Sequence, residues 1–173
     1  METDCRTSTK NSENSKIVIQ LKLLPHLLPP KGRVYLKKQH WKPSIIECKD
    51  SLIVHITILG DITKIQENRR AAAANIGTTL QPYVIAVGPT LAKSNEFFLA
   101  VDTTIYKILS ALEAIDICYK IYHVFDLEYP VESAHLWLLM QRELYHYSND
   151  VDKLTPYVTE TISDLRTLEN TNA

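Results

Sequence analysis

The sequence of 173 residues is poor in cysteine and glycine and has no long apolar run. Its three cysteines are an odd number without a paired spacing, so a disulfide framework is not expected. The four glycines form neither G-x-G-x-x-G nor a phosphate-binding P-loop. No segment approaches the roughly 18 apolar residues of a membrane span, and the N-terminus has no signal-peptide pattern. We therefore expect an intracellular protein of the nucleus or cytoplasm, without a membrane partner.

The histidines and cysteines lack the short spacings that are typical of metal sites. Zinc ligands usually come in pairs such as C-x2-C or H-x3-H, and neither spacing occurs here. His135 and His146 lie about 16 Å apart along one helix, too far to share an ion. Cys118 and His123 fall on different faces of one expected helix, so a thiol–imidazole pair is not expected. We predict no metal site and no cofactor.

Asp102 stands where an aspartic protease would place its catalytic residue, after an apolar strand and before two threonines. Those enzymes need glycine or alanine after the Asp-Thr/Ser pair, because the loop is tight, and Thr104 is bulky. Residues 97–101 and 105–108 flank the DTT segment as the two strands of a hairpin would. We interpret Asp102 as the hairpin tip. Hydrolysis by Asp102 is the least favoured hypothesis, and we predict that the protein is not an enzyme.

The composition is that of an ordinary globular domain, with 45% hydrophobic and 23% charged residues. The net charge is −1, but residues 1–50 are basic overall and residues 109–173 are acidic. Such an asymmetry suits either two different partners or two surfaces that face each other in the fold. We expect a disordered tail over residues 1–15, which are polar, and then a single α+β domain over residues 16–169.

The first half of the chain predicts several strands and one helix. Residues 17–21 alternate as a short strand would, and residues 33–36 are a second short candidate. Residues 52–59 and 83–87 are rich in β-branched apolar side chains, which predicts buried strands. In the segment between them, the expected helix N-cap is Asp61 and the expected left-handed C-cap is Gly77. This β-α-β unit places its two strands in parallel.

Three helices are expected in the last third of the chain. Ser110 and Glu113 have the spacing of a capping box, which predicts a helix start. Pro130 is expected to begin a second helix, and Thr155 with Pro156 a third. The fold class predicted from these elements is α+β, with a small mixed sheet of four or five strands covered by about three C-terminal helices.

Three segments resemble a C-terminal module found in many uncharacterised animal proteins. The segments are HWKPSIIECKDSLIVHI, LQPYVIAVGPTL and AIDICYKIYHVFDLEYPVESAHLWLLMQRELY, and they run in one order from about His40 to Asp152. In those proteins the module often follows zinc fingers or a sterile alpha motif domain. It has no established activity, so the resemblance implies no catalytic residue. What it implies is protein interaction in a nuclear or regulatory setting.

The segment KGRVYLKKQHWK, residues 31–42, is basic, contains no acidic residue and interleaves aromatic rings. Cations can neutralise phosphates while rings stack on bases, as in single-strand binders. The favoured alternative is an exposed strand edge kept soluble by lysines, with the tryptophan buried under the sheet. The overall pI of 6.6 supports that alternative, because nucleic-acid domains are usually more basic. The candidate binding residues are Arg33, Lys37, Lys38, Trp41 and Lys42.

The function that the sequence favours is a non-enzymatic protein–protein interaction module. The expected partner is another protein, and a second copy of the chain is one candidate. Nucleic-acid binding through residues 31–42 is the alternative.

Overall fold

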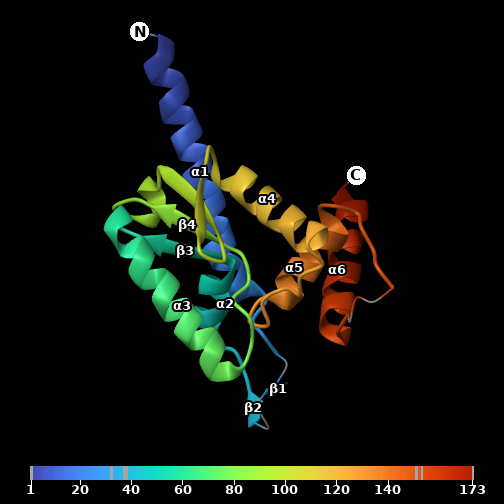
Figure 1. The fold of residues 1–173 in the computed structure, drawn as a ribbon. Helices are drawn as coiled ribbons and strands as arrows, with labels where there is room; N and C mark the ends of the chain where they lie inside the picture. The colour runs from blue at the N-terminus through green and yellow to red at the C-terminus, as the bar shows by residue number, and fades with distance from the viewer. Residues whose placement is uncertain (1, 32, 37–38, 151, 153, 173) are drawn as a thin grey trace.

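The computed structural model describes residues 2–31, 33–36, 39–150, 152 and 154–172. The elements are, in chain order, α1 (Glu2–Leu27), β1 (Val34–Leu36), β2 (Gln39–Trp41), α2 (Ile45–Leu52), β3 (Ile53–Ile56), the 3-10 turn η1 (Leu59–Asp61), α3 (Ile62–Ile76), β4 (Tyr83–Val87), the 3-10 turn η2 (Leu91–Lys93), β5 (Glu96–Val101), β6 (Thr104–Ile108), α4 (Ala111–Val124), α5 (Ala134–Glu143) and α6 (Pro156–Asn172). Figure 1 shows α3 on one side of the sheet and α1 with α4 on the other, while α5 and α6 lie farther out.

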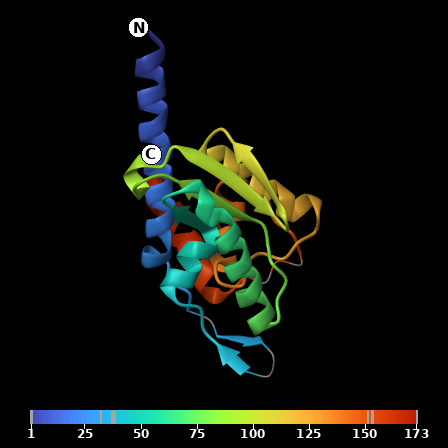
Figure 2. The same cartoon turned by 60° about the vertical axis from the view of Figure 1, so that its left-hand side comes forward.

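The main sheet has four strands in the order β3-β4-β5-β6. β3 pairs with β4 in parallel, and α3 connects them; the β4–β5 and β5–β6 pairs are antiparallel. β1 and β2 form a separate antiparallel hairpin, which projects at the end of the protein opposite the N-terminus (Figure 2). The predicted α+β class, with its β-α-β unit and helices over a mixed sheet, is confirmed.

Side chains alternate between two cores along the central strands. In β4, Val84 and Ala86 belong to the core shared with α1 and α4, whereas Tyr83 and Ile85 belong to the core under α3. This two-residue period is that of any extended strand. Both faces of β4 are buried, so its sequence is continuously apolar instead of alternating. The fully buried Trp137 adds α5 to the first core.

Helix α1 takes the place of two features that the sequence predicts. A disordered tail was expected over residues 1–15 and a strand at residues 17–21, but the structure has one helix over Glu2–Leu27. The strand prediction is wrong, and residues 2–15, where the tail was expected, are helical. The N-terminal part of this helix extends beyond the rest of the protein (Figure 2), and the remainder lies against the core.

Polar residues on the buried face of α1 explain the difference. Asn14, Val18 and Lys22 recur every four residues on one helix face, and all three are buried. Asn14 Oδ1 accepts a hydrogen bond from the Ala111 N–H at the start of α4 (3.0 Å). Lys22 Nζ pairs with a carboxylate oxygen of Asp50 in α2 (2.7 Å). A pattern built on apolar residues omits Asn14 and Lys22, and what remains looks like a strand.

The helix ends agree with the sequence at three points and differ at two. Gly77 ends α3 with φ of 79°, Ser110 Oγ accepts from the N–H three residues on (3.2 Å), and α6 begins at Pro156. Asp61 makes no capping bond, because its backbone is already helical and an N-cap needs extended backbone. Pro130 does not begin α5; a turn follows it before the helix starts.

The contact between α1 and α4 can be tested with Asn14→Ala. The substitution leaves the buried Ala111 N–H without its acceptor, so the free energy of unfolding should fall by about 1–2 kcal/mol, as measured by urea denaturation. Glu13→Ala is the control, because Glu13 is exposed on the same helix and its loss should change stability by less than about 0.5 kcal/mol. Equal stability of Asn14→Ala and the unmodified protein would contradict this packing.

Candidate functional site

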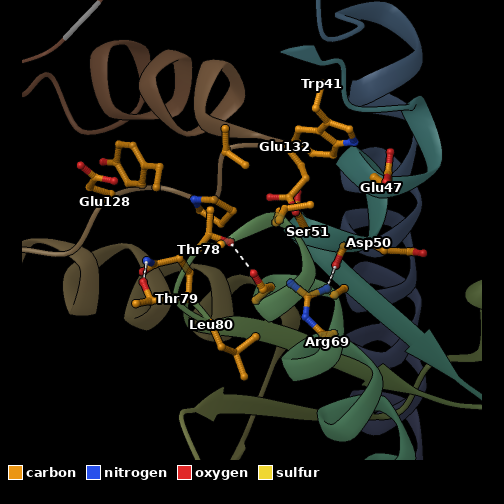
Figure 3. Close-up of a pocket in the computed structure, with 18 of the residues that line it drawn as sticks. Trp41, Glu47, Asp50, Ser51, Arg69, Thr78, Thr79, Leu80, Glu128 and Glu132 are labelled. Carbon is orange, nitrogen blue, oxygen red and sulfur yellow. Dashed lines mark hydrogen bonds between the residues drawn. The ribbon is translucent and has the colours of Figure 1, made fainter. Parts of the chain in front are cut away.

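A cavity of about 530 Å³ lies between α2, α3, the loop after α3 and residues 128–132. We call it the α2–α3 pocket. Trp41, at the end of β2, completes its wall. Figure 3 shows Trp41, Glu47 and Glu132 toward one end of the pocket, and Arg69 with Leu80 toward the other.

Capping interactions fix the two helices that form the walls. Ser44 and Glu47 form a reciprocal capping box at the start of α2: the Ser44 N–H donates to Glu47 Oε2 (2.7 Å) and the Glu47 N–H to Ser44 Oγ (3.2 Å). At the end of α3, the N–H groups of Gly77 and Thr78 both donate to Ala73 O (2.9 Å). Gly77 has positive φ, which glycine adopts readily, and this turns the following loop along the pocket.

Arg69 is held at the pocket wall by two contacts. Its guanidinium carbon lies 4.1 Å from the centre of the Tyr83 ring, and Nη1 donates to the main-chain oxygen of Asp50 (2.7 Å). Burial lowers the pKa of Arg69, and Tyr83 and Glu132 oppose that effect, so the side chain stays protonated. Nε is buried without a hydrogen-bond partner among the described residues. One donor of the guanidinium therefore lacks a partner among the described residues.

Asp50 connects this arginine to α1. Its carboxylate binds Lys22, and its main-chain oxygen binds Arg69, so one residue of α2 contacts both neighbouring helices. Burial lowers the pKa of Lys22, while the hydrogen bond and the charge of Asp50 raise it. The charge of the Asp50 carboxylate is thus balanced by Lys22 on the α1 side.

Glu132 is a half-buried carboxylate in the pocket wall. No hydrogen bond or ion pair joins it to another described residue. Its charge acts on the groups around it: it opposes the lowering of the Arg69 pKa and contributes, after burial, to raising the pKa of Cys48 to about 12. The pocket therefore presents an unpaired carboxylate and an incompletely bonded guanidinium.

The predicted basic segment is only partly brought to this site. Trp41 lines the pocket and is half-buried. Its ring is therefore neither buried under the sheet nor fully exposed to solvent. Arg33 and Lys42 are exposed and do not line the pocket. Lys37 and Lys38 lie outside the described residues. Of the described candidates in this segment, Trp41 therefore lines the pocket and the two cations do not.

Asp102 lies in the turn of the β5–β6 hairpin, as predicted. Val101 pairs with Thr104, which leaves Asp102 and Thr103 as a two-residue loop. Asp102 has φ of 53°, a conformation that short polar residues tolerate and that such hairpin loops require. It is exposed and does not line the pocket.

The histidines and cysteines do not converge. His135 lies 2.9 Å from Leu28 O through Nε2, and burial lowers its pKa. Cys118 is fully buried in the core, whereas His123 is exposed beside the Tyr129 hydroxyl (3.0 Å). Among the described residues, no group of three or more His, Cys, Asp or Glu could hold a metal ion.

Comparison of the chain with protein-family models, curated proteins and solved structures gave no match. In the part of the chain that the structure describes, no helix combines the length and apolar character of a membrane span.

The central residues of the pocket were not among the predicted candidates. Arg69 lies in a helix that looks solvent-facing, and Glu132 follows a proline in an irregular segment. The sequence did hold one local signal, because Ser44 and Glu47 have capping-box spacing and so mark the start of α2. Nothing local in the sequence links α2 to residues 128–132, which lie far along the chain.

The buried thiols should be unreactive in the folded protein. Burial raises the pKa of both Cys48 and Cys118 to about 12, so both stay protonated at pH 8. In a Cys5→Ser variant, Ellman's reagent at pH 8 should label these thiols slowly under native conditions and fully in denaturant. Rapid native labelling of either residue would contradict the described packing.

The hairpin turn can be tested at Asp102. Asp102→Gly should raise the free energy of unfolding by up to about 1 kcal/mol, because glycine adopts positive φ without strain. Asp102→Val should lower it, since a β-branched residue is strained there. Urea denaturation measures both. A loss of stability in the glycine variant would indicate that the aspartate side chain has another role.

Proposed function

We propose that this chain is a non-enzymatic protein-interaction module of the nucleus or cytoplasm, and that it binds a segment of a partner protein in the α2–α3 pocket. The observation that carries the proposal is the half-buried Arg69 at the wall of a 530 Å³ cavity, whose Nε has no hydrogen-bond partner among the described residues. Buried donors are costly without a partner, and a bound ligand would supply one.

A polypeptide segment suits this pocket. Its volume falls within the range of about 300–1,000 Å³ that ligand sites occupy. The walls alternate apolar side chains such as Ile46, Ile76 and Leu80 with the polar groups of Arg69 and Glu132. A peptide main chain offers a carbonyl to the guanidinium and an N–H to a carboxylate, while its side chains cover the apolar walls. The resemblance of residues 40–152 to a module of uncharacterised animal proteins implies protein interaction and so favours the same role.

Nucleic acid remains the alternative partner, through residues 31–42. The exposed Arg33 and Lys42 suit phosphate contacts, but Trp41 faces a pocket that carries several carboxylates. Carboxylates repel phosphate, so the ring is poorly placed to stack on a base. Single-strand binding that weakens steeply with salt would favour this alternative.

The proposal is tested by selecting peptides from a displayed random dodecapeptide library with the full chain. Ala72 lines the pocket and is exposed, so Ala72→Trp should fill the pocket without disturbing the core. We expect enriched peptides to bind the unmodified chain and to lose about tenfold or more in affinity for Ala72→Trp, since blocking a groove removes its contacts. Isothermal titration calorimetry measures both affinities.

The matched control is Ala71→Trp, because Ala71 is exposed on the same helix and does not line the pocket. It should bind the peptides as the unmodified chain does. No enrichment over the starting library, or equal affinity for Ala72→Trp, would overturn the proposal. Sedimentation of the chain alone tests a second copy as partner: a dimer broken by Ala72→Trp would identify the chain itself as the occupant.

A further inference from the structure

The charges around the α2–α3 pocket favour a positively charged ligand group. Among the described lining residues, Arg69 is basic. The acidic lining residues are Glu47, Asp50, Glu128 and Glu132. Lys22 neutralises the Asp50 carboxylate from the α1 side, which still leaves three carboxylates against one guanidinium. A cation therefore meets complementary charge, whereas an anion is repelled.

Glu132 is the carboxylate best placed to receive that charge. It is half-buried and forms no hydrogen bond or ion pair with another described residue. A carboxylate partly withdrawn from water without a counter-ion costs free energy, which an incoming cation would recover. Arg69 acts on Glu132 only across the pocket and forms no ion pair with it, because the Tyr83 ring and the Asp50 main-chain oxygen hold the guanidinium on the other side.

Trp41 gives the same end of the pocket an aromatic wall. Figure 3 shows its indole near Glu132, with Glu47 alongside. Indole faces attract ammonium and guanidinium groups, and they also cover the alkyl stems of lysine and arginine. Ile46 adds apolar surface to the lining. An aromatic face beside carboxylates is suited to a long basic side chain.

We infer that the pocket selects an arginine or lysine side chain of the partner segment, with its charge at Glu132 and Glu47 and its stem on Trp41. The inference rests on the proposed function and adds the chemistry of the occupant. Arg69 then donates a hydrogen bond to a main-chain carbonyl of the same segment at the other end of the pocket. The two ends of the pocket thus recognise different parts of one peptide.

The composition of the enriched dodecapeptides tests this inference first. We expect arginine plus lysine to be enriched at one position about threefold or more over the starting library, because rim and pocket charges select complementary partners. In an enriched peptide, replacing that residue with glutamine should weaken binding about tenfold, since the peptide would then leave the Glu132 carboxylate unpaired. Because this replacement is made in the peptide, it cannot disturb the fold of the protein.

Glu132→Gln is the matching change in the protein, and it should also weaken the basic peptide about tenfold. Glu67→Gln is its control, because Glu67 is exposed on α3 and does not line the pocket; it should bind within about twofold of the unmodified chain. Binding should also change tryptophan emission. Trp137 is fully buried, so the change should disappear in Trp41→Phe.

The outcomes separate the inference from the proposed function. Enriched peptides without a basic preference that still lose affinity for Ala72→Trp would overturn the inference and leave the proposed function standing. Enrichment of acidic residues would also overturn it, and would indicate that Arg69 dominates recognition. Peptides that bind Ala72→Trp and the unmodified chain equally would overturn both the inference and the proposed function.

Discussion

The position of Asp50 between two cations holds α1, α2 and α3 together. Its carboxylate binds Lys22 of α1, and its main-chain oxygen accepts from Arg69 of α3, so a residue of α2 joins three helices. Lys22 is buried, and a buried ammonium is stable only when it is paired. The ion pair therefore fixes α1 against α2, and it offsets part of the negative charge that Asp50 brings to the pocket. Arg69 is left as a guanidinium that is held in place but incompletely bonded.

Helix α1 contacts both α4 and the sheet in the first core. Asn14 caps α4 through Ala111, and Val18 lies among the apolar side chains of α4 and the sheet. Helix α4 in turn packs on β4 and contributes Tyr122, whose hydroxyl donates to Pro82 O (2.6 Å) just before that strand. The far wall of the pocket follows α4 in sequence, so its position depends on this packing. A helix that stands where the sequence predicted a tail and a short strand thus supports the candidate site.

Regular elements with buried apolar faces were predictable from the sequence, and contacts between distant segments were not. The β4 strand and the β5–β6 hairpin follow from β-branched runs and a two-residue turn at Asp102, which are local patterns. Helix α1 was missed because Asn14 and Lys22 occupy its buried face, and their partners lie far away in sequence. The pocket was missed for the same reason. Its wall combines α2 and α3 with residues 128–132, and no spacing along the chain signals that Glu132 faces Arg69.

In the proposed complex, the α2–α3 pocket is the binding surface and one ligand contacts both of its walls. Amide hydrogen exchange of the full chain, with and without an enriched peptide at saturation, tests this claim most directly. Slower exchange at residues 46–51, 72–81 and 128–132 is the expected result, since both walls would lose solvent access together. Protection that falls instead on the exposed strand β6, with both walls unchanged, would contradict the account.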